Sequence, residues 1–307
     1  MSGDVRSGAK SSVLAEARRP PPATPGYFRR VWRRLWQDKL AIIALVMLTI
    51  IVALALAAPL ISEHLLHADP TRVRLTQKLK PPSAEHRLGT DEYGRDTAAR
   101  LLYAGRVSLT FAFMVMAIDF IIGVIFGLIA GYFGGRVDDA INGLIQVINN
   151  IPTIFLLIAL SVIFRPGVIG LAFLFGVTGW TGIARQVRGR VFAERQLDYV
   201  DAARLAGAST PRILFTHILP NVSSVILVLV GFDIAGAILG EAGLSYLGFG
   251  VQIPTPSWGN MLSNALATFS DTPWLVIAPG LAISLTLFAI YLFNDGLRDA
   301  LDPRLNK

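Results

Sequence analysis

Apolar residues gather in six runs along the chain, and polar segments separate them. The runs cover residues 40–61, 107–131, 143–164, 168–183, 222–240 and 274–293. A helix needs about 20 apolar residues to cross the hydrocarbon core of a bilayer, and these runs approach or exceed that length. The pattern therefore predicts an all-α membrane protein with six transmembrane helices.

Two of these runs carry residues that influence helix packing. Gly123, Gly127 and Gly131 recur at every fourth position of the second run. Such spacing predicts a face of small residues that allows another helix to approach closely. Pro152 interrupts the third run.

The composition supports a membrane protein. Hydrophobic residues make up 53% of the 307 residues, the mean hydropathy is +0.55, and charged residues make up 16%, against about 25% in soluble domains. The net charge of +7 is therefore interpreted as basic loops facing an anionic lipid bilayer, and not as a nucleic-acid surface. The chain has no Cys, which excludes disulfides, thiolate metal sites and a cysteine nucleophile.

The polar segments define the predicted parts of the chain. These are a disordered cytosolic tail (1–26), an interfacial amphipathic helix (27–39), an external loop (62–106), a five-helix core (107–293) containing a cytosolic loop (184–221) and an external loop (241–273), and a cytosolic tail (294–307). Apolar and arginine side chains of 27–39 take opposite helical faces, which favours a helix lying on the membrane over a basic flank that only sets orientation. Lys and Arg number 19 on the side of the termini and 9 on the other side. This bias places both termini in the cytosol.

The cytosolic loop contains a polar segment that predicts two short helices joined by a turn. Tyr199, Ala202, Ala203 and Ala206 fall at i, i+3, i+4 and i+7, on one stripe of the first helix. Because nearly all of these side chains are small, another protein's surface can approach the helix backbone closely.

Residues at the ends of the two short helices predict where each begins and stops. Asp198 is predicted to cap the first helix together with Asp201, and Gly207 to end it. Thr210 is predicted to cap the second helix, which Pro220 closes before the next apolar run.

This hairpin resembles the signature loop of membrane permease subunits in ABC importers. The family pattern is Glu-Ala-Ala, three residues, Gly, nine residues, Ile, one residue and Leu-Pro. The residues in register are Asp201, Ala202, Ala203, Gly207, Leu219 and Pro220. Asp201 replaces the usual Glu and keeps its charge, and His217 replaces the usual Ile.

Longer blocks narrow the resemblance to the C-type subunit of the dipeptide, oligopeptide and nickel permease group. These blocks are LGTDEYGRD at 88–96, AGYFGG at 130–135, EAGLSYLGFG at 241–250 and PTPSWG at 254–259. The resemblance covers roughly residues 30 to 305. It departs from the group where Gly143 and Gln146 stand in place of the usual Arg and Asp of the third span.

The resemblance implies the type I ABC importer permease fold, with cytosolic coupling helices, in a bacterial or archaeal plasma membrane. It implies as partners a second homologous permease subunit, two cytosolic ATPase subunits that bind ATP and Mg, and an extracytoplasmic substrate-binding protein. The implied ATPase-coupling residues are Tyr199, Asp201, Ala202, Ala203, Ala206 and Gly207. The implied cargo is a di- or oligopeptide, with nickel, glutathione or oligosaccharide as alternatives in the same group.

The chain itself is predicted to be a non-catalytic transport subunit that binds no cofactor. The phosphate-binding pattern Gly, four residues, Gly-Lys-Ser/Thr does not occur in the sequence. An intramembrane enzyme would need a convergent His, Ser or acid cluster, which the runs lack. A proton-coupled secondary transporter using Asp119 or Asp233 is the other rival, and the lack of two clearly repeated halves weighs against it.

Two further sets of residues have open interpretations. Candidates for docking a binding protein, or alternatively for loop scaffolding, are Asp91, Arg95, Asp96, Pro254, Pro256 and Trp258. Asp119 and Asp233 lie inside apolar runs, where acids are costly; they either line the path for an amine-bearing cargo or form a hydrogen-bonded packing pair. Asn149 and Asn150 either line the path or join helices.

Overall fold

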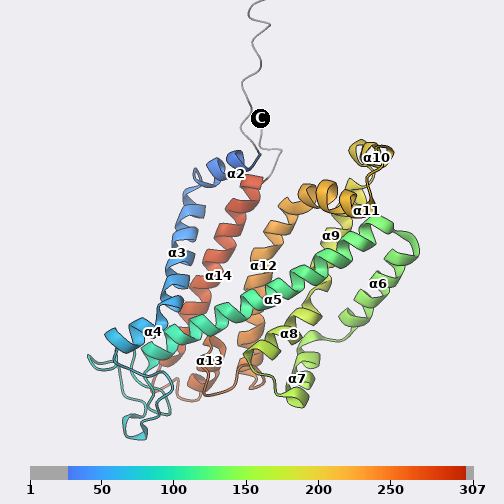
Figure 1. Ribbon diagram of the computed structural model, residues 1–307. Coiled ribbons are helices and arrows are strands. Elements are labelled where there is room, and N and C mark those ends of the chain that lie inside the picture. The colour runs from blue at the N-terminus through green and yellow to red at the C-terminus, as the bar shows by residue number, and fades with distance from the viewer. Residues whose placement is uncertain (1–26, 302–307) are drawn as a thin grey trace, which may run out of the picture.

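The structure, a computed structural model, describes residues 27–301, and its regular secondary structure is helical throughout this range (Figure 1). The elements are α2 (Tyr27–Leu35), α3 (Lys39–Leu56), α4 (Ala58–Leu60), η1 (Ile61–Leu65), η2 (Leu75–Gln77), α5 (Thr97–Phe133), α6 (Gly135–Asn150), α7 (Thr153–Phe164), α8 (Val168–Gly179), α9 (Thr181–Glu194), α10 (Asp198–Leu205), α11 (Thr210–Arg212), η3 (Ile213–Ile218), α12 (Leu219–Tyr246), α13 (Trp258–Leu266) and α14 (Trp274–Leu301). Four helices are long and apolar enough to cross a membrane, or up to six if each of two bent pairs is one span. The predicted all-α membrane fold is confirmed.

The two bent pairs are α6 with α7 and α8 with α9. The first pair bends by 77° and the second by 40°. Pro152 lies at the first bend, and the residue before it, Ile151, is extended with φ −92° and ψ 120°. Proline disfavours helical backbone at the preceding residue and donates no backbone hydrogen bond, so the helix stops there. Because α6 begins at Gly135, the pair starts before the apolar run at 143.

The longest helix, α5, has 37 residues and so a length of about 55 Å at 1.5 Å per residue. This exceeds the roughly 30 Å hydrocarbon core, and α5 runs obliquely across the bundle (Figure 1). Three of its glycines face α9. A Cβ on Gly123, Gly127 or Gly131 would lie within 3.0 Å of α9 atoms or of the Trp180 carbonyl oxygen just before α9, which confirms the predicted small-residue face.

The two ends of the bundle differ in their elements. The C-terminal end of α14, α2 and α10 lie at one end, and the segment 62–96 and α13 lie at the other (Figure 1). Leu35 of α2 packs against Ala41 and Ala300, with Val31 beside them, while Trp32 is 59% exposed. The predicted tail at 1–26, and residues 302–307 of the other predicted tail, lie outside the described residues.

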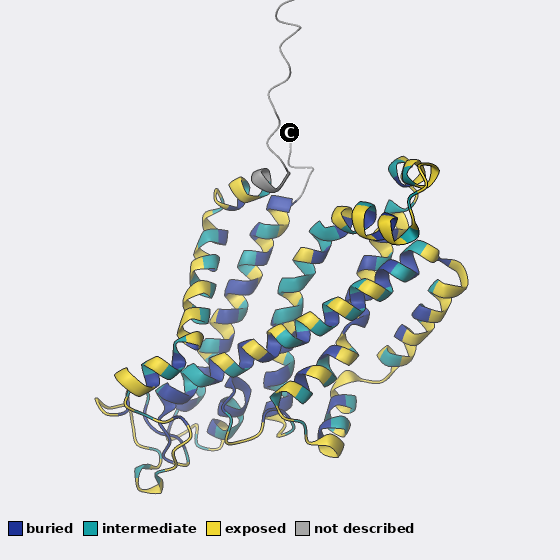
Figure 2. Ribbon diagram, in the orientation of Figure 1, coloured by how far each residue is buried: buried dark blue, intermediate teal, exposed yellow. Residues whose placement is uncertain are grey.

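Apolar side chains also cover much of the outer surface. Figure 2 shows exposed positions along the outer faces of the long helices, and among them are Ile43, Ile50, Ile121 and Phe288. Large exposed apolar surfaces of this kind mark contact with lipid or with another protein. Because the longest helices can cross a membrane, we interpret this apolar surface as the one that faces lipid or another protein within the bilayer.

Candidate functional site

The hairpin at the α2 end of the bundle begins with α10, whose termini differ in part from the prediction. Leu197 occupies the N-cap position, and Asp198 is already in the first turn, where it makes no capping hydrogen bond. The predicted Asp198 cap is therefore wrong. Its carboxylate still lies near the positive end of the helix dipole.

Gly207 ends α10 as predicted. Its φ is +79°, its N–H donates to the Arg204 carbonyl, and the next N–H, of Ala208, donates to the Ala203 carbonyl. These two bonds form a Schellman motif, which needs a left-handed residue at this position. A glycine adopts that conformation without strain.

The second helix of the hairpin continues into the following span. Ser209, and not Thr210, is the N-cap of α11. The helix then passes through the π-helical η3 into α12, where Pro220 lies in the first turn. The prediction that Pro220 ends this helix is therefore wrong, because a π-helical segment directly before it breaks the regular bonding in which proline would clash.

The predicted small-residue stripe of α10 divides between two environments. Tyr199 and Ala203 pack on a hydrophobic cluster of the chain itself, whereas Ala202 and Ala206 are exposed. Asp201 is exposed and pairs with Arg204, with 3.0 Å between Oδ1 and Nη1. The division follows from Val200.

Val200 anchors α10 to the bundle. Its side chain is fully buried in a cluster that includes Leu128 of α5, Val187 and Val191 of α9, and Ile213 of η3. Burying a valine contributes roughly 1.5–3 kcal/mol. The cluster also includes residues of α12, so it joins α10 to four other elements, α5, α9, η3 and α12.

Polar contacts add to this anchor. The Tyr199 hydroxyl donates to Glu194 Oε2 at 2.8 Å, and burial, together with this acceptor, raises the pKa of Tyr199 to about 12. Arg195 Nη1 donates to the Tyr132 carbonyl at 2.8 Å, and the Arg204 guanidinium lies 5.4 Å from the centre of the Tyr132 ring. These contacts fix α10 against the ends of α5 and α9.

The outward face of α10 carries a large apolar residue that the sequence interpretation missed. Leu205 is 91% exposed, the largest exposed fraction among the large apolar side chains described. It lies beside Ala202 and Ala206 on a helix that protrudes from the bundle (Figure 1). The sequence offered one signal for this exposure: Leu205 follows Ala202 by three positions and so lies on the side of α10 away from Val200.

At the opposite end, the residues predicted for docking are mostly buried. Asp91, Arg95 and Asp96 belong to the segment between η2 and α5, and all three are buried. Arg95 Nε donates to Asp91 Oδ2 at 2.6 Å, and Arg100 Nε lies 3.3 Å from the same oxygen. Burial raises the pKa of the neighbouring Glu92, and the negative charge of Asp91 adds to the effect. The geometry matches loop scaffolding.

The remaining docking candidates surround α13. Trp258 is buried, with its backbone N–H donating to Ser108 Oγ and its ring Nε1 donating to the Leu101 carbonyl. Pro256 is buried as well, and Pro254 is exposed. Pro254 is therefore the one predicted docking residue with an exposed side chain.

Two buried acids organise this end: Glu241, to which the prediction gave no role, and the docking candidate Asp96. Glu241 accepts hydrogen bonds from Ser245 at 2.6 Å, from Ser257 at 2.7 Å and from Ser108 at 3.4 Å, and so joins α12, α13 and α5. Asp96 caps α5 by accepting from the Ala99 N–H. The signal for Glu241 was a single acid at the end of an apolar run.

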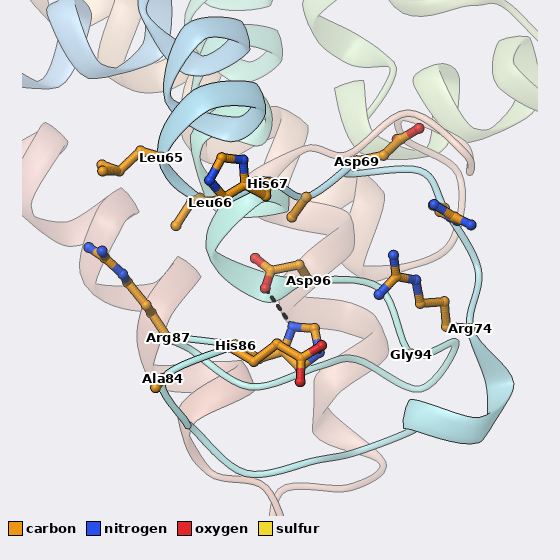
Figure 3. Close-up of a pocket in the computed structure, with 13 residues that line it drawn as sticks. Leu65, Leu66, His67, Asp69, Arg74, Ala84, His86, Arg87, Gly94 and Asp96 are labelled. Carbon is orange, nitrogen blue, oxygen red and sulfur yellow. Dashed lines mark hydrogen bonds and ion pairs between the residues drawn. The ribbon is translucent and has the colours of Figure 1, made fainter.

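Asp96 also accepts a hydrogen bond from His86 Nδ1 at 2.9 Å, in a cavity of about 380 Å³ (Figure 3). Other residues around this cavity include Asp69, Arg74 and Arg87. Their charges are mixed, and the hydrogen bond between His86 and Asp96 holds two distant parts of the segment together.

The acids inside the apolar runs come together in a second cavity. Asp119 of α5 and Asp233 of α12 both line a cavity of about 540 Å³ between α5, α7, α8, α9 and α12. Asn149 accepts a hydrogen bond from the Thr181 hydroxyl at 2.9 Å, and Asn150 is exposed. Neither asparagine is among the residues lining this cavity.

An ion pair elsewhere connects the broken third span to α9. Arg188 Nη2 donates to Asp138 Oδ2 at 2.6 Å, and Asn142 donates to the same carboxylate. Gly143 and Gln146 leave no ion pair at the positions usual for the resembling group. The Asp138–Arg188 pair joins α6 to the helix that leads into the hairpin.

Bent apolar helices, a protruding hairpin at one end and a cavity with acids at its wall are the features of a multi-span membrane protein. Comparison with known families identifies the family to which the chain belongs. Residues 123–307 match the family described as "Binding-protein-dependent transport system inner membrane component". Residues 26–82 match "N-terminal TM domain of oligopeptide transport permease C". The chain belongs to this family of inner-membrane transport components, which has the type I ABC permease fold.

Curated relatives align over nearly the full chain. The dipeptide transport system permease protein DppC of Bacillus subtilis (strain 168) is 41% identical over 92% of this chain and 87% of its own length. The oligopeptide transport system permease protein OppC of the same organism is 36% identical over 94% and 97%. The di/tripeptide transport system permease protein DppC of Pseudomonas aeruginosa (strain UCBPP-PA14) is 37% identical over 95% and 97%. The chain is thus a multi-pass protein of a bacterial inner membrane that works within a transport complex.

Proposed function

We propose that this chain is one of two permease subunits of an ATP-driven importer for di- and oligopeptides, and that α10 couples it to cytosolic ATPases. The observation that carries the proposal is a helix with a buried anchor, Val200, and an exposed apolar tip, Leu205. Burying a leucine in a partner's groove contributes roughly 1.5–3 kcal/mol. Peptide cargo is supported by the relatives' names.

The proposed coupling follows from what α10 contacts. ATP binding and hydrolysis by the two ATPases, which hold the ATP and Mg, would move α10. Val200 would transmit the movement to α5, α9 and η3, because a packed cluster shifts as a unit. The chain itself does no chemistry in this scheme.

The orientation follows from the same scheme. The α10 end of the bundle, which also carries α2 and the end of α14, faces the cytosol in this proposal (Figure 1). The opposite end, formed by the segment 62–96 and α13, then faces the extracytoplasmic binding protein. The buried network around Glu241 keeps that rim rigid, and exposed residues such as Pro254 offer the contact surface.

The test is the substitution Leu205→Glu in the complex with its second permease and ATPases. We expect the ATPases to be lost on purification, and ATP-driven uptake of a labelled dipeptide into proteoliposomes to fall by at least tenfold. The matched control for ATPase retention is Leu75→Glu, since Leu75 is 68% exposed at the opposite end. Uptake is not compared for this control, because that end faces the binding protein in the proposal.

Two results would contradict the proposal. If the Leu205→Glu variant retains the ATPases and takes up peptide as the parent complex does, α10 is not part of the coupling interface. Uptake that follows a proton gradient with this chain alone would favour the secondary transporter instead.

A further inference from the structure

Two acids from different helices line the cavity between α5 and α12. Asp119 and Asp233 both face it, and their carboxyl groups lie close enough to interact. Asp119 is 2% exposed. Its Oδ1 and the Oδ2 of Asp233 are buried without a hydrogen-bond partner among the described residues, and both residues line the cavity.

The charge of this pair lacks compensation within the chain. Two carboxyl groups this close repel each other when both are ionised. No Lys or Arg is among the described residues that line the cavity. An uncompensated charge in such surroundings is costly, and a cation that enters the cavity would offset that cost.

The wall around the acids is mostly apolar, with side chains such as Leu157, Phe175 and Phe232, and four glycines leave gaps in it. A Cβ on Gly179 would lie 2.6 Å from Asp119 Oδ2, so the acid packs directly against bare backbone. Gly182 and Gly236 also line the cavity, and a Cβ on either would meet nothing within 4 Å. Such a wall leaves room for side chains of different shapes and offers little to select among them.

Peptides of different sequence share a terminal ammonium group and differ in their side chains. A cavity of about 540 Å³ lies in the range of small-molecule sites. Asp119 lies in the central part of α5 and Asp233 near the middle of α12, at the depth where transporters commonly hold cargo.

We propose that the Asp119–Asp233 pair is a binding site for the ammonium group of the cargo. The pair would therefore select peptides with a free amino terminus as they cross the membrane. This inference rests on the proposed function, since it assigns the class of cargo to the same permease. The apolar wall with its glycine gaps accepts the variable side chains, and the acid pair binds the shared ammonium group.

The first experiment compares two labelled dipeptides, one with a free amino terminus and one N-acetylated, in proteoliposomes of the complete complex with a saturating binding protein. The double variant Asp119→Asn/Asp233→Asn removes the charge and keeps the side-chain shape. We expect its preference for the free amine to fall about tenfold or more, the effect of losing a charged hydrogen bond. Asp139→Asn, an exposed acid on α6, is the control and keeps the preference.

A second measurement does not depend on delivery by the binding protein. A hydrophobic carbodiimide modifies protonated carboxyl groups in apolar surroundings, and mass spectrometry quantifies the modification of Asp119 in the purified complex. We expect the free-amine dipeptide to protect Asp119 and the N-acetylated dipeptide to leave it reactive.

The outcomes separate the inference from the proposed function. Any of three results overturns the proposed ammonium site: an unchanged preference in the double variant, an equal loss of uptake for both peptides, or equal protection of Asp119 by both peptides. An equal loss for both peptides would mean that the pair only packs α5 against α12, or pairs with a cation of the second permease. Absence of ATP-driven peptide uptake in the parent complex would instead refute the proposed function.

Discussion

The packing of α5 against α9 yields a quantitative prediction about Gly127. A Cβ at this position would lie 2.7 Å from the Val187 Cβ and 2.8 Å from the Ala184 carbonyl oxygen, whereas carbon atoms in contact are about 3.5–4.0 Å apart. The substitution Gly127→Ala therefore forces the helices apart by about 1 Å. Overpacking of this kind costs typically 1–3 kcal/mol.

The control variant isolates this packing cost. Gly189 lies on α9, and a Cβ there would meet nothing within 4 Å. Both Gly→Ala substitutions gain the same helix propensity of about 1 kcal/mol, so the difference between them reports packing alone. At roughly 2–4 °C per kcal/mol, we expect the Tm of Gly127→Ala to lie on the order of 2–12 °C below that of Gly189→Ala.

The measurement is thermal unfolding of the purified chain in detergent, followed by tryptophan fluorescence. Trp180 is a suitable reporter because it is buried beside the junction of α8 and α9. A Tm of Gly127→Ala equal to or above that of Gly189→Ala would refute the close packing of α5 on α9.

Two further predictions concern the end that carries α13. Glu241→Ala leaves three buried serine hydroxyls without their acceptor, and we expect a loss of about 3 kcal/mol or more in unfolding free energy. Ser263→Ala removes one hydrogen bond of a partly exposed serine on α13 and should change it by about 1 kcal/mol or less; similar values for both would argue against the network. Asp96→Ala removes the cap of α5 and the partner of His86, and we expect a loss of about 1–2 kcal/mol with faster hydrogen exchange in residues 62–96. The control Asp69→Ala, at an exposed acid, should leave exchange near α5 unchanged, and identical exchange in the two variants would contradict the assigned role of Asp96.

Local patterns alone were sufficient for much of the fold. The lengths of the apolar runs predicted the membrane-crossing helices, because a bilayer sets how many apolar residues a helix needs. The spacing of Gly123, Gly127 and Gly131 predicted a close helix contact, since residues four apart share one face. Gly207 ended α10 because the left-handed conformation there suits glycine.

Tertiary packing decided which faces of these elements are buried. Helical spacing placed Tyr199, Ala202, Ala203 and Ala206 together, but Val200 determined which of them face the chain, and a periodicity does not specify which stripe meets the core. Pro220 likewise ended no helix, because a preceding π-helical segment accommodates it. Burial of Asp91 and Arg95 depends on their pairing with each other and with Arg100, which no single-residue preference predicts.

The cavity shows the same difference most clearly. Each of Asp119 and Asp233 was recognisable in the sequence as an acid in an apolar run, but their contact depends on α5 and α12 lying side by side. The number of residues between Asp119 and Asp233 in the sequence does not say how close their side chains lie in the fold. The sequence determined that two acids enter the membrane, and the packing of helices distant in sequence brought their carboxyl groups to one cavity, with Asp119 against the bare backbone of Gly179.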